Sequence, residues 1–334
     1  MSLGDDLQRR WYAPSASPAW WMLPLATLYG WVTGMRRRMY RRGWLRSVRL
    51  PVPVIVVGNI VAGGAGKTPL VIALVEGLRE HGFNPGAVSR GYGGKVDEPQ
   101  LLEARPDPAW VGDEPALIHN RTGVPVAVGA DRVAASRLLI DAGVDVIVAD
   151  DGLQHYALGR DVEICVVDGE RRFGNGILLP AGPLREPVSR LHDVDLVVCN
   201  GGAPGTDEVP MRLLLADAVG VADQSVRKPL DAFSGQRVHA VAGIGNPRRF
   251  FDSLRAYGIE VTEHLFPDHR RFAARDLEFC DEAPVLMTEK DAIKCRGFAK
   301  PSWWAVPVSA DLPDGFVDDL VACLHPSAST HGGS

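Results

Sequence analysis

The 334-residue sequence contains only five cysteines, and no two of them have C-x-x-C spacing. This absence argues against a zinc knuckle and a disulfide framework, and it is typical of a reducing, cytosolic compartment. With a net charge of −5, the chain lacks the excess of basic residues that is typical of a general nucleic-acid binder. No internal repeat is present, and the 46% hydrophobic and 23% charged residues suit one large α/β unit or two lobes.

Charge is also missing from Trp11 to Met35, a stretch rich in tryptophan and leucine, whereas residues 36–49 carry seven arginines. A signal peptide has the reverse order, so cleavage and export are not expected. Prolines and glycines interrupt the stretch, and tryptophan suits a membrane interface. We expect residues 1–50 to form a membrane-associated helix with a basic flank, lying in the bilayer surface. The alternatives are a helix that spans the bilayer and one that packs on the protein's own core.

The stretch VPVIVVGNIVAGGAGKTP, residues 52–69, predicts a strand, a glycine-rich loop and the start of a helix. Glycines allow backbone N–H groups to surround phosphate oxygens, a lysine adds positive charge, and a threonine hydroxyl is a ligand for Mg²⁺. The strict phosphate-loop pattern has glycine where this chain has Val61. The expected nucleotide-binding residues are Val61, Ala62, Gly63, Gly64, Ala65, Gly66, Lys67 and Thr68.

A second apolar run, VDVIVADDG, ends in Asp150 and Asp151. A buried strand that delivers carboxylates beside a phosphate loop is what a Mg²⁺-dependent nucleotide enzyme needs. We therefore expect Thr68, Asp150 and Asp151 to hold the metal. Helix capping by Asp151 is the alternative, but it gives Asp150 no role.

Further candidate residues lie in loops that follow predicted strands, where α/β proteins bind substrates. SRGYGG places Arg90 and Tyr92 in one such loop, and the long loop 168–187 contains Glu186. A surface loop whose glycines only form turns is the alternative for SRGYGG. Arg132 begins a predicted helix, where a basic residue opposes the dipole, and is either a ligand contact or part of an ion pair.

Two further clusters of charged residues each allow more than one role. Asp113 and Glu114 begin a predicted helix, and capping is the simpler interpretation. FPDHRRF, residues 266–272, places His269 between a carboxylate and arginines, an environment that suits proton transfer near phosphates.

The fold class expected is α/β: a P-loop NTPase-like, mostly parallel sheet flanked by helices, with a second, smaller α/β lobe. We place the P-loop core at 51–205, the second lobe at 206–325 and a disordered tail at 326–334. In the second lobe, VAGIGNP matches only half of a dinucleotide-binding pattern. Lys290 and Asp291 of MTEKDAIK are interpreted as helix-capping residues.

Seven stretches taken together resemble one family, the tetraacyldisaccharide 4′-kinases, which are the lipid A 4′-kinases of Gram-negative bacteria. The resemblance covers residues 15–325, and its most specific parts are the phosphate loop without its first glycine, DDGLQH and LPAGPLREP. The stretches are GNIVAGGAGKTP, SRGYGG, GDEP, VDVIVADDGLQH, FGNGILLPAGPLREP, FPDHRRF and MTEKDAIK.

The resemblance implies transfer of the ATP γ-phosphate to the 4′-hydroxyl of a tetraacylated disaccharide 1-phosphate at the cytoplasmic face of the inner membrane. Its cofactors would be ATP and Mg²⁺, and its partners the lipid A precursor and membrane lipids, with no nucleic acid and no obligate protein. It assigns Lys67 to ATP and makes Asp113 and His269 the pair that accepts the hydroxyl proton. The implied substrate-binding residues are Arg90, Tyr92, Arg132, Gln154, His155 and Glu186.

The competing function is a membrane-associated P-loop switch ATPase that acts on a protein partner. Such ATPases carry an extra lysine in the phosphate loop, where this chain has Ala62. A third hypothesis is a non-enzymatic nucleotide-binding module. This hypothesis gives no joint role to the acidic pair Asp150 and Asp151 and to Asp113 and His269.

Overall fold

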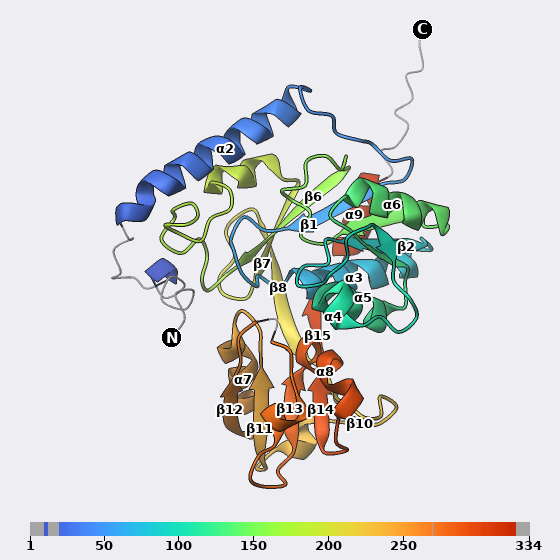
Figure 1. Cartoon of the computed structure of the whole chain (residues 1–334), viewed down its shortest axis with the longest axis vertical. Coiled ribbons are helices and arrows are strands. Elements are labelled where there is room, and N and C mark those ends of the chain that lie inside the picture. The colour runs from blue at the N-terminus through green and yellow to red at the C-terminus, as the bar shows by residue number, and fades with distance from the viewer. Residues whose placement is uncertain (1–9, 13–19, 269, 325–334) are drawn as a thin grey trace.

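The computed structural model describes residues 10–12, 20–268 and 270–324. These residues form two α/β lobes, and helix α2 (Leu23–Arg41) lies along the side of the first lobe that faces away from the second (Figure 1). His269 and the predicted tail 326–334 lie outside the described residues. The expected α/β class with a mostly parallel main sheet and a smaller second lobe is confirmed.

The first lobe is built on a sheet with nine strands among the described residues, and only its two edge strands are antiparallel to their neighbours. Its inner strands are continuous apolar runs, as expected for parallel strands covered on both faces. In sheet order the strands are β15 (Val308–Asp311), β8 (Glu208–Leu215), β7 (Leu196–Asn200), β6 (Val162–Asp168), β1 (Val54–Gly58), β5 (Val146–Ala149), β2 (Pro85–Ser89), β4 (Val126–Val128) and β3 (Gln100–Leu101).

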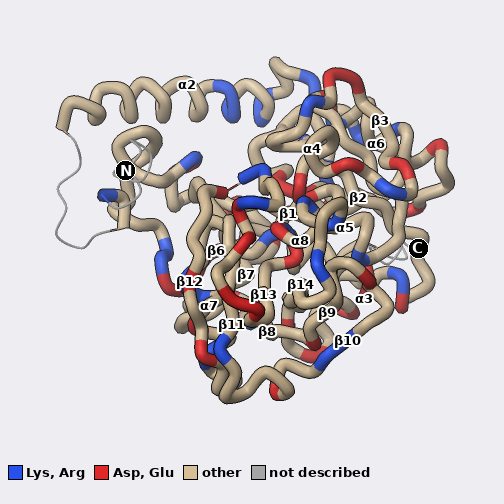
Figure 2. The backbone as a smooth tube through the Cα atoms, turned by 60° about the horizontal axis from the view of Figure 1, so that its bottom comes forward, with Lys and Arg blue, Asp and Glu red and all other residues tan. Residues whose placement is uncertain are grey.

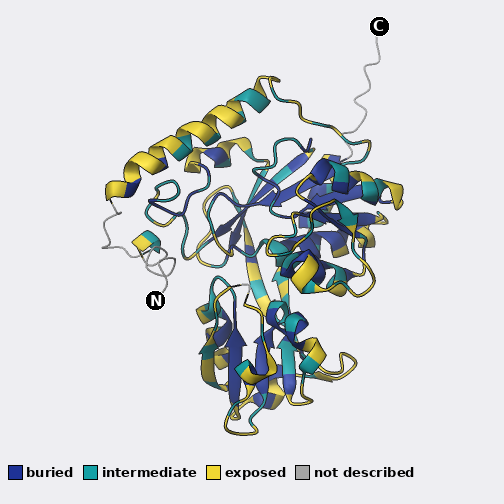
Figure 3. Cartoon of the chain, in the orientation of Figure 1, coloured by how far each residue is buried: buried dark blue, intermediate teal, exposed yellow. Residues whose placement is uncertain are grey.

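Successive residues of β1 face opposite sides of this sheet, because side chains alternate along a strand. Ile55 and Val57 pack with helices α3 (Lys67–Glu80), α5 (Asp113–Thr122) and α9 (Phe316–Leu324). Val54 and Val56 pack with α6 (Arg132–Asp141) and with the loop that contains Leu184. The buried layers are visible in Figure 3, where α2 by contrast is largely exposed.

The second lobe has a sheet with six strands in the described part of the chain. Helix α7 (Pro247–Ala256) covers one face through Phe250, Phe251 and Leu254, and α8 (Glu289–Cys295) packs on the other. In sheet order the strands are β10 (Arg227–Lys228), β9 (Ala218–Gly220), β14 (Trp303–Val306), β13 (Val285–Thr288), β11 (Arg237–Ala242) and β12 (Glu260–Leu265). Short helices within the described residues include η1 (Trp20–Met22), α4 (Pro108–Val111), η2 (Val188–Asp193), η3 (Leu230–Phe233), η4 (Ala274–Leu277) and η5 (Arg296–Phe298).

Two strand connections join the lobes. The chain leaves the first lobe between β8 and β9, and it returns between β14 and β15, so that β15 pairs antiparallel with β8. The boundary between the lobes therefore differs from the one expected after residue 205. Strands β8 and β15 and helix α9 all belong to the first lobe. This return depends on a pairing between strands almost 100 positions apart, which local sequence patterns do not reveal.

Helix α2 has its arginines at its C-terminal end, as the blue positions in Figure 2 show. Within the residues that the structure describes, no helix combines the length and the apolar character that a membrane crossing requires.

The return of the chain to the first lobe predicts that α9 stabilises that lobe. Leu320 is 1% exposed and packs in the same cluster as α3. Leu320→Ala should lower the free energy of unfolding by about 2–5 kcal/mol, because it leaves a cavity in a packed core. Urea denaturation measures the change, with Cys323→Ser on the exposed face of α9 as the matched control. Equal stability of the two variants would contradict the packing of α9.

Candidate active site

The phosphate loop runs from the end of β1 to the start of α3, in the order predicted. Gly66 adopts a φ of 91°, and a Cβ there would lie 2.3 Å from the Asn200 side-chain nitrogen, so this position requires glycine. Val61, which replaces the usual first glycine, forms a β-bridge with Leu184. The backbone N–H of Ala62 donates to the Pro183 carbonyl at 2.8 Å. A paired, extended backbone accommodates a valine, and this explains the departure from the strict pattern.

Asp151 is held by two cations from separate segments. Lys67 Nζ lies 3.3 Å from its Oδ1, and Arg185 Nη1 lies 2.9 Å from its Oδ2. Burial raises the pKa of Asp151, but the charges of Lys67 and Arg185 outweigh that effect and hold the pKa below the usual range. Arg132 donates to the backbone carbonyl of Asp151 at 2.8 Å, so it supports the aspartate's backbone, which has a φ of 49°.

Asp150 is in the opposite situation. It is 1% exposed, and neither carboxylate oxygen has a hydrogen-bond partner among the described residues. Burial, together with the negative charge of Glu114, raises the pKa of Asp150. An ionised carboxylate that is buried without hydrogen bonds costs folding free energy unless a bound cation compensates its charge.

Within the described part of the chain, no three His, Cys, Asp or Glu side chains gather closely enough to hold a metal ion by themselves. A metal at this site would need the Thr68 hydroxyl or a ligand's phosphates as further donors.

A cleft of about 640 Å³ opens between the lobes beside the phosphate loop. Residues 62–68, Tyr92 and Asp151 line it from the first lobe, whereas Val61 and the buried Asp150 are not among its lining residues. Asn246, Arg249 and Phe250 at the start of α7 line it from the second lobe, and Leu213 and Leu215 of β8 line its apolar part. Arg171 joins the two sides, because its guanidinium donates to the carbonyls of Gly64 and Gly245, each at 3.3 Å.

Lys290 of α8 also lines this cleft. Its Nζ lies 3.3 Å from Glu114 Oε1 and 3.2 Å from Asp268 Oδ1. Burial lowers the pKa of Lys290, but these carboxylates outweigh burial and the pKa lies above its usual range. The capping role expected at this turn belongs to Thr288, whose Oγ1 accepts from the Asp291 N–H. Lys290 is instead an ion-pair partner between the lobes.

Asp113 does not line the nucleotide cleft. It is 7% exposed, is the first residue of α5, and contributes to a separate pocket of about 360 Å³ with Arg271 and Lys294. Its predicted partner His269 lies outside the described residues, so the pairing stays a prediction.

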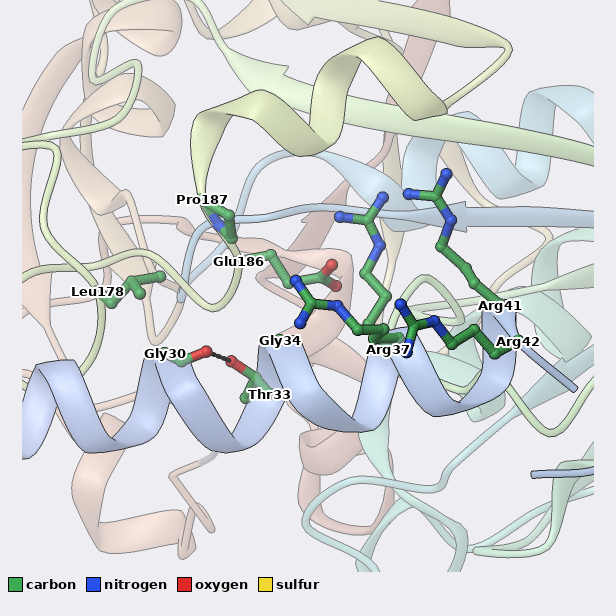
Figure 4. Close-up of a pocket in the computed structure, with 10 residues that line it drawn as sticks. Gly30, Thr33, Gly34, Arg37, Arg41, Arg42, Leu178, Glu186 and Pro187 are labelled. Atoms are coloured by element: carbon green, nitrogen blue, oxygen red, sulfur yellow. Dashed lines mark hydrogen bonds between the residues drawn. The ribbon is translucent and has the colours of Figure 1, made fainter. Parts of the chain in front are cut away.

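Glu186 lies in a third pocket, of about 570 Å³, between α2 and the loop that contains Leu178 (Figure 4). Its oxygens accept from Gln154 Nε2 at 2.8 Å and from the Tyr156 hydroxyl at 2.6 Å. Arg37 of α2 lines the same pocket and forms an ion pair with Asp193. Two predicted substrate residues, Gln154 and Glu186, are therefore in contact beneath α2.

The remaining predicted substrate residues lie near these sites without lining the cleft. Arg90 is exposed at the end of β2. Burial lowers the pKa of His155 to about 4, and its Nε2 has no hydrogen-bond partner within the described residues. The sequence patterns indicate neither the contacts of Arg171 and Arg185 nor the ion pairs of Lys290, although Arg185 lies in the LPAGPLREP block.

Comparison with known proteins identifies the family. The sequence model of the family described as tetraacyldisaccharide-1-P 4′-kinase matches residues 18–325. The tetraacyldisaccharide 4′-kinase of Stenotrophomonas maltophilia is 56% identical over 323 residues, which cover 94% of this chain and 95% of that protein. The same enzyme of Nitrosococcus oceani is 51% identical over 323 residues, covering 96% and 94%.

A solved structure agrees with these matches. The crystal structure of LpxK from Aquifex aeolicus in complex with ATP superposes with a TM-score of 0.76 at 28% identity, over 91% of this chain and 98% of that one. These similarities span nearly the whole chain and decide against a switch ATPase. The chain belongs to the tetraacyldisaccharide 4′-kinase family.

Proposed function

We propose that this chain transfers the γ-phosphate of ATP to the 4′-hydroxyl of a tetraacyldisaccharide 1-phosphate, a step of lipid A biosynthesis. The observation that carries the proposal is the cleft, which the phosphate-loop lysine lines together with Asp151, its ion-pair partner. The adjacent Asp150 is buried next to it, with no hydrogen-bond partner for its carboxylate among the described residues. Phosphoryl transfer depends mainly on alignment and on neutralising charge. Lys67 and the backbone of the loop supply both for the ATP phosphates.

Mg²⁺ fits the acidic pair, and the two aspartates have different roles. Both oxygens of Asp151 face cations already, whereas Asp150 retains two buried oxygens for a ligand. Of the three predicted metal residues, Thr68 and Asp150 are the ones that would hold the ion, and Asp151 would hold Lys67 and Arg185 in place. When bound, Mg²⁺ neutralises charge on the ATP phosphates.

Asp113 and His269 are proposed to accept the proton of the attacking hydroxyl. A carboxylate beside an imidazole orients it and makes it more basic. Glu114, which follows Asp113 in the sequence, and Asp268, which precedes His269, both form ion pairs with Lys290, and this supports the proposed pairing.

The lipid substrate is proposed to reach the enzyme along α2, at the cytoplasmic face of the inner membrane. Leu25, Leu28, Val32 and Met35 share one face of this helix and are all exposed, and Trp31 beside them is 63% exposed. Such an apolar face with arginines at one end suits an interface with anionic lipids. Arg90, Tyr92, Arg132, Gln154, His155 and Glu186 remain the proposed substrate residues.

Phosphate transfer from γ-labelled ATP, in detergent micelles with Mg²⁺, tests the proposed function. We expect label in the tetraacyldisaccharide product with the native enzyme and a loss of at least about a hundredfold for Lys67→Ala, since Lys67 neutralises charge on the transferred group. Label released only as free phosphate, with none in lipid, would refute the proposal.

The division of roles between the aspartates predicts different responses to Mg²⁺. Asp150→Asn should raise the Mg²⁺ concentration for half-maximal activity at least about tenfold, because it weakens a direct ligand. Asp151→Asn should mainly lower kcat, because Lys67 and Arg185 lose their anchor. Mg²⁺ titrations at saturating ATP compare the two variants, and the reverse pattern would contradict these assignments.

The exposed face of α2 predicts binding to vesicles that contain anionic phospholipids. Replacing Leu28 and Trp31 by serine should weaken binding about tenfold, because less apolar area enters the bilayer. Sedimentation with vesicles measures the change, and Trp110→Ser, a similarly exposed tryptophan on α4, is the matched control. Unchanged binding of the double variant would remove α2 as the membrane contact.

A further inference from the structure

Helix α8 of the second lobe faces α5 of the first lobe through ion pairs, and one of them differs from the others. The side chains of Lys294 and Asp113 are 8% and 9% exposed. In the neighbouring pair, Lys290 and Glu114 are 14% and 29% exposed. The three pairs are Arg121–Glu289 at 2.8 Å, Glu114–Lys290 at 3.3 Å and Asp113–Lys294 at 3.6 Å.

The Lys294 ammonium lies between two buried carboxylates and beside an aromatic ring. Its Nζ is 2.9 Å from Asp291 Oδ1 and 3.6 Å from Asp113 Oδ2. It also lies 5.2 Å from the centre of the Phe272 ring. At 3.6 Å the contact with Asp113 exceeds hydrogen-bond length, so Lys294 acts on this carboxylate mainly through its charge.

Asp291 is held through its Oδ2 and forms an ion pair with Lys294 through its Oδ1, although neither Oδ1 nor Lys294 Nζ makes a hydrogen bond within the described residues. Its side chain is fully buried, and its Oδ2 accepts from the backbone N–H of Gly243 at 2.8 Å and from the Thr288 hydroxyl at 2.7 Å. These donors lie at the ends of β11 and β13 in the second-lobe sheet. Oδ1 is left to face Lys294, and the contacts form a continuous chain from that sheet to Asp113.

We propose that Lys294 is a positioning residue for phosphoryl transfer: it keeps the Asp113 carboxylate ionised and correctly placed across the lobe boundary, and Asp291 holds Lys294 in position. The inference rests on the proposed role of Asp113 in accepting the hydroxyl proton. A buried carboxylate favours its neutral form, and an adjacent buried cation opposes that tendency. Lys294 itself need not touch substrate.

Other charged groups also lie near Asp113, and their charges limit how much the loss of Lys294 changes the protonation of the Asp113 carboxylate. Lys290 adds positive charge from α8, and Glu114 adds negative charge from α5 itself. Asp107 and Arg271 line the same pocket as Asp113, and His269 lies outside the described residues. Among the described cations, Lys294 is the one that forms an ion pair with the Asp113 side chain.

The test compares Lys294→Met, Lys294→Arg and Arg121→Met by their kcat, their KM for ATP and their pH profiles in the phosphate-transfer assay. Arg121→Met is the matched control, because it breaks an α5–α8 pair that does not involve Asp113. Without the cation, Asp113 takes up a proton at higher pH, so the acidic limb of kcat should move upward. General-base catalysis contributes about 10²–10⁴-fold to the rate of a reaction. We therefore expect Lys294→Met to lower kcat at least about tenfold.

The expected result also includes a KM for ATP within about twofold of the native value, substantial recovery in Lys294→Arg, and a native pH profile for Arg121→Met. A native kcat and acidic limb in Lys294→Met would overturn the inference, as would an identical shift in Arg121→Met. If Lys294→Met fails to fold, Asp291→Asn tests the same chain of contacts, and a native profile there overturns it equally.

An Asp113→Asn arm separates this inference from the proposed function. If Asp113→Asn retains near-native kcat, the proposed role of Asp113 fails and the inference fails with it. If Asp113→Asn loses activity while Lys294→Met keeps the native kcat and profile, only the role of Lys294 is overturned.

Discussion

The carboxylate of Asp151 binds Lys67 of the phosphate loop and Arg185 of a distant loop, and the arrangement of the nucleotide cleft depends on this contact. Without it, two partly buried cations would repel each other beside the phosphate loop. The same loop pairs through its backbone with residues 183–185, so side chain and main chain fix one geometry. The neighbouring Asp150 has no hydrogen-bond partner among the described residues, and this difference between adjacent aspartates is the basis for their separate roles.

The second constraint is the boundary between the lobes. Two strand connections and three ion pairs between α5 and α8 join them, and Arg171 links the phosphate loop to Gly245. The nucleotide cleft and the Asp113 pocket lie on this boundary, and each takes residues from both lobes. The geometry of both sites therefore depends on how the lobes pack. This arrangement gives residues such as Lys294 influence without contact with a substrate.

Local patterns predicted much of this from the sequence. The apolar runs that become β1, β2 and β5 are continuous because both faces are buried, and the glycine–lysine–threonine turn between β1 and α3 has a backbone signature. The rest depended on distant contacts. No local sequence pattern indicates the pairing of β15 with β8. Asp150 and Asp151 are the same residue type, so the sequence does not show that Asp151 is the one that forms ion pairs with Lys67 and Arg185. Lys290 was interpreted as a cap because its partners Glu114 and Asp268 come from separate segments.

We propose above that Asp150, and not Asp151, is the aspartate that faces the metal. A crystal structure of the protein with Mn²⁺ and a non-hydrolysable ATP analogue, with the metal located by its anomalous scattering, tests it most directly. We expect a metal peak nearest an Asp150 oxygen and the Thr68 hydroxyl, with Asp151 still paired to Lys67 and Arg185. A metal bound by Asp151, with Lys67 displaced from it, would contradict these roles of the two aspartates.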